Sequence, residues 1–196
     1  LIVDCAQAYH AQPKGRASFC SPRKFFGVAD GGIVFGVEAA VYEQDDSSAR
    51  QQHLIVRKGK GASVGYPLFQ AAEESLVDAP IRTMSAVTVA ALEKFDAATA
   101  TQKRRANFAF LHERLQTSFP FALADDDVPM AYPYVTEDAA LRSRLIANKI
   151  YVAKYWPGLS AAANALAERI IPLPIDQRYG ENEMQMICKM FQGEMI

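Results

Sequence analysis

The chain has 196 residues, of which half are hydrophobic and 22% are charged, the composition of an ordinary globular protein. Its net charge of −1 offers no attraction for nucleic acid or an acidic membrane, and no apolar run reaches the roughly 18 residues of a membrane span. Its three cysteines form neither a metal-binding spacing nor an even disulfide set, so a reducing, cytoplasmic compartment is favoured.

Short apolar segments predict three strands in the first part of the chain. They are residues 1–4, 17–20 and 33–35, and a loop with Pro13 and Gly15 connects the first two. Long connections between strands favour a parallel α/β sheet. Because the first strand begins directly at the terminus, we expect this chain to be the C-terminal part of a longer protein.

Helical patterns follow these strands. Residues 47–58 and 68–77 predict two helices, and Ser85 is a suitable N-cap for a third helix that runs to Phe95. The sheet-rich character ends near this point. We therefore expect two domains, a larger sheet-containing part and a smaller α+β part: residues 1–96 and 97–196.

A longer helix is predicted at the start of the second domain. We expect Thr101 to cap it, and Phe108, Leu111 and Leu115 to form its apolar stripe. Its opposite face carries charged side chains that we expect to be solvated: Lys103, Arg104, Glu113 and Arg114.

The rest of the chain alternates strands and helices. The predicted elements are strands at 130–135, 150–153 and 170–175, and helices that Thr136 and Ser160 cap, followed by a last helix with Met184, Ile187, Cys188 and Phe191 on its apolar face. Pro172 and Pro174 lack backbone donors, so the third of these segments is predicted to be an edge strand or an extended segment.

Lys24 is the main candidate for chemistry. It lies in a turn over residues 21–27, which Pro22 and nearby glycines stiffen and in which Phe25 and Phe26 supply apolar walls. A lysine amine in such a turn can form a Schiff base with a carbonyl cofactor. Most lysines are surface charges, so the interpretation depends on the neighbouring residues.

Four further residues supply what pyridoxal phosphate (PLP) needs besides an amine. Asp4 ends a predicted parallel strand, where open α/β sheets bind ligands, and its carboxylate can keep a pyridine nitrogen protonated. Gln7 can donate to a ring oxygen. Ser18 and Ser21 are both candidate donors to the phosphate.

Other kinds of site have less support. His10, His53 and His112 form no ligand cluster, and the sequence has neither a P-loop nor a dinucleotide-binding glycine motif. The Ser-x-x-Lys spacing of Ser21 and Lys24 also occurs in β-lactamases, but the further motifs of that class are missing.

These residues resemble one known family, the DegT/DnrJ/StrS family of PLP-dependent sugar aminotransferases. The resemblance covers nearly the whole chain in order, through Asp4-Cys5-Ala6-Gln7-Ala8, Ser18-Phe19, Lys24, Gly27-x-x-Asp30-Gly31-Gly32, residues 152–157 and residues 172–179. It implies the end of a fold type I large domain, a mostly parallel sheet with helices, followed by a smaller α+β C-terminal domain.

The resemblance also implies roles for single residues. Lys24 would hold PLP covalently, Asp4 would pair with the pyridine nitrogen, and Gln7 would contact the ring oxygen. Ser18 matches the phosphate contact of the family, but it lies one residue further from the lysine than is usual, so Ser21 is the alternative. The family forms homodimers, and its N-terminal half carries a phosphate-binding loop and an aromatic residue that stacks on the cofactor.

The chain departs from the family at the contact with the partner subunit. The family usually offers an Asn there, whereas the matching residues 80–85 contain none. Arg82 is a candidate replacement.

The resulting hypothesis is an aminotransferase that moves an amino group from an amino acid to a keto-sugar, which we expect to be nucleotide-linked, with PLP as cofactor. Two alternatives stay open. One is a catalytically silent homologue that acts as a binding or scaffold protein. The other is a PLP enzyme that acts on a plain amino acid.

Overall fold

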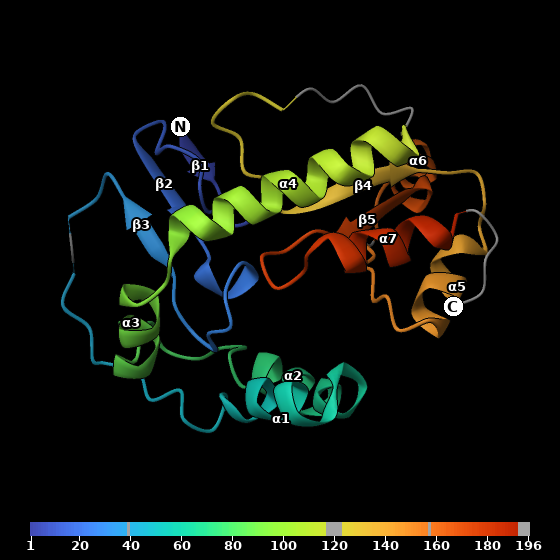
Figure 1. Cartoon of the computed structure of the whole chain (residues 1–196). Helices are drawn as coiled ribbons and strands as arrows, with labels where there is room; N and C mark the ends of the chain where they lie inside the picture. The colour runs from blue at the N-terminus through green and yellow to red at the C-terminus, as the bar shows by residue number, and fades with distance from the viewer. Residues whose placement is uncertain (39, 117–122, 157, 192–196) are drawn as a thin grey trace. The chain divides into compact units, whose positions relative to one another are not determined.

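The computed structural model describes residues 1–38, 40–116, 123–156 and 158–191 (Figure 1). The chain forms two compact units, Leu1–Phe95 and Asp96–Ile196, which are called unit 1 and unit 2 below. None of the described helices combines the length and the apolar character that crossing a membrane requires.

Unit 1 contains a three-stranded sheet in the order β1-β2-β3. Its strands β1 (Ile2–Asp4), β2 (Ala17–Cys20) and β3 (Ile33–Phe35) confirm the three strand predictions. β1 and β2 are parallel, but β3 is antiparallel to β2. The expected mostly parallel sheet is therefore only half right here. The connection from β2 to β3 holds only a 3₁₀ turn and no crossover helix, so the chain reverses direction.

Three helices complete unit 1. They are α1 (Gln52–Lys60), α2 (Ala62–Glu74) and α3 (Ala86–Glu93). Gly65 lets α2 approach α1 closely, because a Cβ at this position would lie only 3.1 Å from the carbonyl oxygen of His53. The predicted cap of α3 is confirmed, since the Ser85 hydroxyl accepts a hydrogen bond from the backbone N–H of Thr88 at 3.3 Å.

Unit 2 begins with the long helix α4 (Ala97–Leu115). Its N-cap is Asp96, whose carboxylate accepts hydrogen bonds from the backbone and side chain of Thr99 at 2.9 and 2.6 Å. The prediction that Thr101 caps this helix is therefore wrong. A carboxylate one turn earlier satisfies the first free N–H groups, and Thr101 lies inside the helix.

A two-stranded antiparallel sheet follows, made of β4 (Ala131–Val135) and β5 (Ile170–Pro174). Pro133 and Pro172 are register partners in it. Each strand of a two-stranded sheet has one edge without a partner strand. Prolines, which have no backbone N–H to donate, are tolerated in such strands. The prediction of an edge strand over residues 170–175 is confirmed. Residues 150–153, however, lie outside any strand, and that prediction is wrong.

The remaining helices are α5 (Leu141–Ala147), α6 (Ala161–Arg169) and α7 (Glu181–Lys189). Thr136 does not cap α5, because its hydroxyl accepts from the N–H of Asp138 in a turn before the helix begins. Ser160 is the N-cap residue of α6, but its side chain makes no capping hydrogen bond. Pro157, which belongs to one of the segments of the family resemblance, lies outside the described residues.

Unit 2 encloses a continuous apolar core. α4 contributes Phe108 and Leu111 and α5 contributes Leu145, while Leu115 packs partly buried against them. The core members are Phe108, Leu111, Tyr132, Leu141, Leu145, Val152, Ile171, Leu173, Ile175, Met184, Ile187, Cys188 and Met190. The predicted stripe of α4 and most of the predicted apolar face of α7 therefore lie in one core.

Arg104 is an unexpected part of this interior. It is only 2% exposed, and it donates to the Gln177 side chain at 2.9 Å and to the carbonyl oxygen of Met130 at 3.1 Å. The expectation of a solvated charge is wrong for Arg104, whereas Lys103, Glu113 and Arg114 are exposed. The guanidinium has enough N–H donors to satisfy carbonyl oxygens of residues that lie just outside the sheet.

Candidate functional site

The parallel pairing of β1 and β2 brings two candidate segments to one edge of the sheet. Asp4 and Phe19 are register partners, and the N–H of Cys5 donates to the carbonyl oxygen of Phe19 at 2.8 Å. The carboxyl ends of the two strands therefore coincide. The loop that follows β1 and the turn that follows β2 begin side by side, where open α/β sheets bind ligands.

The loop after β1 is a tight turn that exposes its polar side chains. The Asp4 carboxylate accepts from the N–H of Ala6 at 2.8 Å through Oδ1, and the N–H of Ala8 donates to the carbonyl oxygen of Cys5 at 2.8 Å. The side chains of Asp4 and Gln7 are both exposed. This loop can offer a carboxylate oxygen and an amide to a ligand.

The turn after β2 carries Lys24 as the last residue of a 3₁₀ helix that begins at Pro22. The N–H groups of Phe25 and Phe26 both donate to the carbonyl oxygen of Pro22, at 2.9 and 2.8 Å. Lys24 is exposed, whereas Phe25 is 3% exposed. The backbone of the turn is therefore fixed while the amine points to solvent.

Aromatic contacts join the loop and the turn. The ring of Tyr9 lies 4.6 Å from the ring of Phe26 and 5.8 Å from that of Phe25, measured between centroids. His10 lies 5.8 Å from Phe25. These edge-on and tilted contacts attach the Asp4 loop to the Lys24 turn, so the two segments are positioned by the same small cluster.

The two candidate phosphate donors differ in position. Ser18 is 2% exposed in the middle of β2, where its register partners are Val3 and Phe35. Ser21 is half-buried and immediately precedes the 3₁₀ turn. Only Ser21 therefore lies at the same edge as Asp4 and Lys24.

A buried carboxylate follows the turn, and the sequence motifs assign it no role of its own. Asp30 is 5% exposed and accepts from the N–H of Ser85 at 2.7 Å, from its hydroxyl at 2.8 Å, and from the Thr88 hydroxyl. The Ser47 hydroxyl lies 2.8 Å from that of Ser85 and extends the network. Burial opposes ionisation of Asp30, but these hydrogen bonds outweigh it and hold the pKa of the carboxyl below its usual value.

This network fixes the turn that leads into β3. Gly31 has a φ of 107°, and a Cβ there would lie 3.1 Å from the sulfur of Met84. Asp30 therefore attaches the start of α3 to the Gly-Gly turn next to it. The hydroxyl-bearing residues are too far apart in sequence for spacing alone to have revealed the network.

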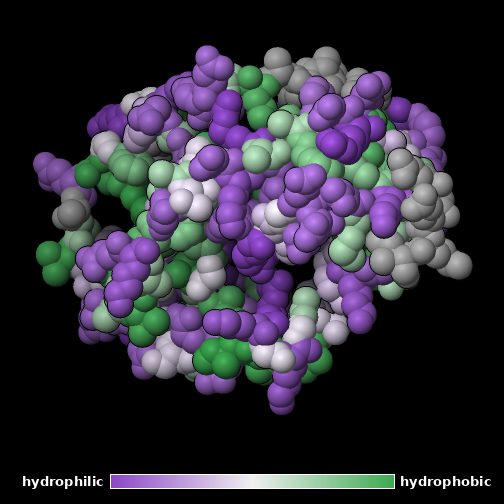
Figure 2. Space-filling model, in the orientation of Figure 1, coloured by the Kyte–Doolittle hydropathy of each residue, from purple (hydrophilic) through white to green (hydrophobic). Residues whose placement is uncertain are grey.

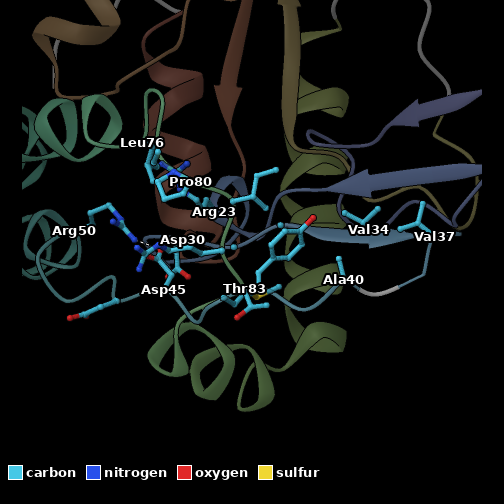
Figure 3. Close-up of a pocket in the computed structure, with 18 of the residues that line it drawn as sticks. Arg23, Asp30, Val34, Val37, Ala40, Asp45, Arg50, Leu76, Pro80 and Thr83 are labelled. Atoms are coloured by element: carbon cyan, nitrogen blue, oxygen red, sulfur yellow. Dashed lines mark hydrogen bonds and ion pairs between the residues drawn. The ribbon is translucent and has the colours of Figure 1, made fainter.

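A cavity of about 1050 Å³ lies beside this network in unit 1 (Figure 3). The labelled side chains of Arg23, Arg50 and Asp45 gather at one end of it, and Val34 and Val37 lie at the other. Lys24 and Asp4 are not among its lining residues, although Arg23 directly precedes Lys24. The cavity and the predicted lysine site thus include neighbouring residues of the chain, but different side chains line them.

The arginines of the cavity are already engaged with carboxylates. Arg50 forms an ion pair with Asp45, and Arg23 forms one with Glu73. Burial lowers the pKa of Arg23, and the nearby Arg50 lowers it further. Arg82, the candidate replacement for the missing Asn, also lines the cavity and lies 3.8 Å from Glu43.

The histidines do not assemble a site. His53 is 5% exposed and its Nδ1 lies 2.7 Å from the carbonyl oxygen of Arg50, while His112 contacts the Tyr132 hydroxyl at 3.4 Å. Among the residues that the structure describes, no group of three or more His, Cys, Asp or Glu side chains is placed to bind a metal ion.

Comparison with known proteins gives a fold. No family model and no curated protein matches the sequence. Solved structures do match, among them a DegT DnrJ EryC1 StrS aminotransferase from Brucella abortus, with 17% identity and a TM-score of 0.60 over 98% of this chain and 56% of that one. The sugar aminotransferase CalS13 from Micromonospora echinospora matches with 17% identity and a TM-score of 0.57, over 99% and 58% of the two chains.

A putative sugar aminotransferase from Streptococcus pneumoniae, Spr1654, matches in its apo form with 17% identity and a TM-score of 0.58, over 98% of this chain and 56% of that one. A second structure of the same protein is described as its PMP form. This chain therefore spans a little more than half the length of the proteins whose fold it shares. The resemblance found in the sequence is confirmed at the level of fold.

Proposed function

We propose that this chain carries the lysine-bearing part of a PLP-dependent aminotransferase that acts on a keto-sugar. The observation that carries the proposal is the parallel pairing of β1 and β2, which brings the loop with Asp4 and Gln7 and the turn with Lys24 to one edge of the sheet. An exposed carboxylate, an amide, a hydroxyl and an amine at one edge fit the polar groups of PLP.

In this proposal each group has a defined role. Lys24 would hold the cofactor through its amine, and the same amine would serve as acid and base in proton transfer. Asp4 holds a proton on the ring nitrogen, and Gln7 donates to the ring oxygen. Ser21 donates to the phosphate, since it lies at the strand end while Ser18 is buried within β2. PLP, when bound, supplies the electron sink for the carbanion.

The cofactor assignment is tested by chemical trapping. The purified protein is incubated with PLP and reduced with borohydride, and the modified peptides are identified by mass spectrometry. Lys24 should carry the label, and the Lys24→Ala variant should lose it together with any visible absorbance. Lys60→Ala, at another exposed lysine of unit 1, is the matched control and should behave as the parent protein. Absence of label on Lys24 would support the silent homologue instead.

The substrate class is tested by half-reactions. PLP-loaded protein is mixed with single amino acids and, separately, with amino-sugar nucleotides, and the loss of visible absorbance is followed. The sugar assignment expects conversion by an amino-sugar nucleotide as well as by an amino-acid donor such as glutamate. If only plain amino acids convert the cofactor, the alternative of an enzyme for amino acids replaces it.

We further propose that the protein acts as a homodimer in the cytoplasm. Arg82 would then be the residue offered to the partner subunit in place of the missing Asn, because it is part exposed at 40% and its ion pair with Glu43 is long, at 3.8 Å. Light scattering of the purified protein measures the mass. A monomer at micromolar concentration in the presence of PLP would contradict the dimer.

A further inference from the structure

Two cysteines lie next to each other at the carboxyl ends of β1 and β2. The pairs Val3↔Ser18 and Asp4↔Phe19 set the register of the two strands. The N–H of Cys5 donates to the carbonyl oxygen of Phe19 at 2.8 Å, a hydrogen bond that belongs to the last register pair of the two strands, Asp4 and Phe19. Cys5 and Cys20 are therefore the residues that directly follow the last pair of two neighbouring strands.

This placement is compatible with a disulfide. Paired strands lie about 4.8 Å apart, and disulfides join residues whose Cα atoms are about 4.4–6.8 Å apart. Cys5 follows the last residue of β1, and its backbone is held on both sides: its N–H donates to the carbonyl oxygen of Phe19, and its own carbonyl oxygen accepts from the N–H of Ala8.

The two thiols differ in access, and both are free. Cys20 is 4% exposed, whereas Cys5 is partly exposed. Burial raises the pKa of the Cys20 thiol, and the nearby Cys5 raises it further. An oxidant from solvent therefore reaches Cys5 first. Cys20, which is less exposed and stays a protonated thiol, reacts second.

We propose that Cys5 and Cys20 form an oxidative modification site, at which a peroxide converts the two thiols to a disulfide. In the first step the Cys5 sulfur attacks the peroxide, the O–O bond breaks, and a sulfenic acid and one water form when the oxidant is hydrogen peroxide. In the second step the Cys20 sulfur displaces the hydroxyl group from Cys5 as a second water. Both thiols are oxidised by one electron each, and the peroxide is reduced by two electrons.

The position of the bridge gives it a consequence, which rests on the proposed function. Cys5 lies between Asp4 and Gln7, and Cys20 directly precedes Ser21. A covalent bond between them would pull the Asp4 loop toward the Lys24 turn. Because misplacing a reacting group by about 1 Å can cost on the order of 100-fold, we expect oxidation to reduce borohydride trapping of PLP on Lys24 by about tenfold or more.

Formation of the bridge is tested without the cofactor. The purified protein is treated with hydrogen peroxide, remaining thiols are alkylated, and peptides are analysed by mass spectrometry with and without a reducing agent. We expect a Cys5–Cys20 cross-linked peptide that reduction releases, while Cys188, buried in unit 2, stays a free thiol. The Cys188→Ser variant should form the same bridge, and Cys5→Ser and Cys20→Ser should not.

Other outcomes would overturn the site. They are oxidation of Cys5 to sulfinic acid while Cys20 remains open to alkylation, or cross-linking of Cys5 between two chains. Cys20→Ser alters a buried position and can disturb folding, but Cys5→Ser alters a partly exposed one and keeps the test decisive. With Cys5→Ser, labelling of Lys24 should be normal and insensitive to peroxide.

The outcome is separable from that of the proposed function. Lys24→Ala should still form the bridge, because the step involves only the two thiols and the peroxide. If the reduced parent protein fails to bind PLP but forms the bridge, the aminotransferase proposal falls and the modification site stands. If PLP is bound to Lys24 and no bridge forms, the modification site falls and the aminotransferase proposal stands.

Discussion

Unit 2 and unit 1 are stabilised in different ways. The continuous apolar core lies in unit 2, where Tyr132, Leu145 and Leu173 are completely buried. In unit 1 several strand residues are exposed, including Ile2 at 70% and Val34 at 57%, while the Asp30 carboxylate is buried among hydroxyl groups. Unit 2 thus gains stability mainly from apolar burial, and unit 1 depends more on specific hydrogen bonds around its candidate site.

The surface agrees with this difference. Figure 2 shows hydrophobic patches scattered among hydrophilic residues on the face it presents. In unit 1 the most exposed large apolar side chains include Leu1, Ile2, Val41 and Ile81. Among the described residues, unit 1 buries more polar side chains than unit 2 and exposes large apolar ones, so we expect it to be the less stable of the two, and mutations can test that difference.

The largest effect is expected in the core of unit 2. Leu145→Ala removes a completely buried side chain and should lower the free energy of unfolding by about 2–5 kcal/mol. The neighbouring Ile146 is 42% exposed, so Ile146→Ala is a matched control with a much smaller effect. Urea unfolding gives the size, and hydrogen exchange shows which unit opens. Equal losses for both variants would contradict the assignment of the core.

Arg104 should give the next largest effect. Arg104→Met keeps much of the volume but removes the donors to Gln177 and Met130, so we expect a loss of roughly 1.5–3 kcal/mol. Lys103→Met, at the exposed neighbouring position, should change stability little. The same urea titration measures both variants. If Arg104→Met left the free energy of unfolding unchanged, the buried hydrogen bonds of Arg104 would make no net contribution to stability.

In unit 1 the corresponding test is Asp30→Asn. The amide keeps one acceptor oxygen of the two, so the expected loss is about 1–2 kcal/mol and should appear in the exchange of unit 1 alone. Because the folded carboxyl has a lowered pKa, its stabilisation is present above the ordinary pKa of an aspartate and is lost as the pH falls through the folded value. In Asp30→Asn, the free energy of unfolding should therefore fall less steeply as the pH is lowered into the acid range. Glu38→Gln, an exposed lining residue of the cavity, is the control and should leave that curve unchanged.

The smallest effect is a pH dependence from His53. Burial lowers the pKa of His53, and Arg57 and Arg23 lower it further against a hydrogen bond to the carbonyl oxygen of Arg50. The unfolded state then binds the proton more readily, so unit 1 should lose less than about 1 kcal/mol as the pH falls from 7 to 6. Thermal unfolding of His53→Gln should lack this slope, and His112→Gln in unit 2 should retain it. Stability that rises on acidification would contradict the sign.

Local signals were sufficient for many elements. The strands at residues 17–20 and 33–35 are short apolar runs between turn residues, and Ser85 is followed by a helix, so their patterns depend on nearby residues only. Errors arose where two local solutions competed. Asp96 and Thr101 are both acceptable caps, and the helix begins at the earlier one, where the Asp96 carboxylate accepts from the N–H of Thr99.

The candidate site likewise has features that the sequence predicts and features that only the tertiary structure shows. The sequence by itself determined that an acid, an amide, a hydroxyl-bearing turn and Lys24 follow one another in a short stretch, because residue type and spacing are written in the chain. Only the tertiary structure decided which of them share an edge: the register of β1 and β2 places Ser21 with Asp4 and buries Ser18. It also decided that Ser47, Ser85 and Thr88 converge on Asp30, that Arg104 is buried, and that Cys5 and Cys20 follow the last paired residues of two neighbouring strands. These features join residues far apart in sequence, and such pairs are set by strand pairing and packing rather than by local preference.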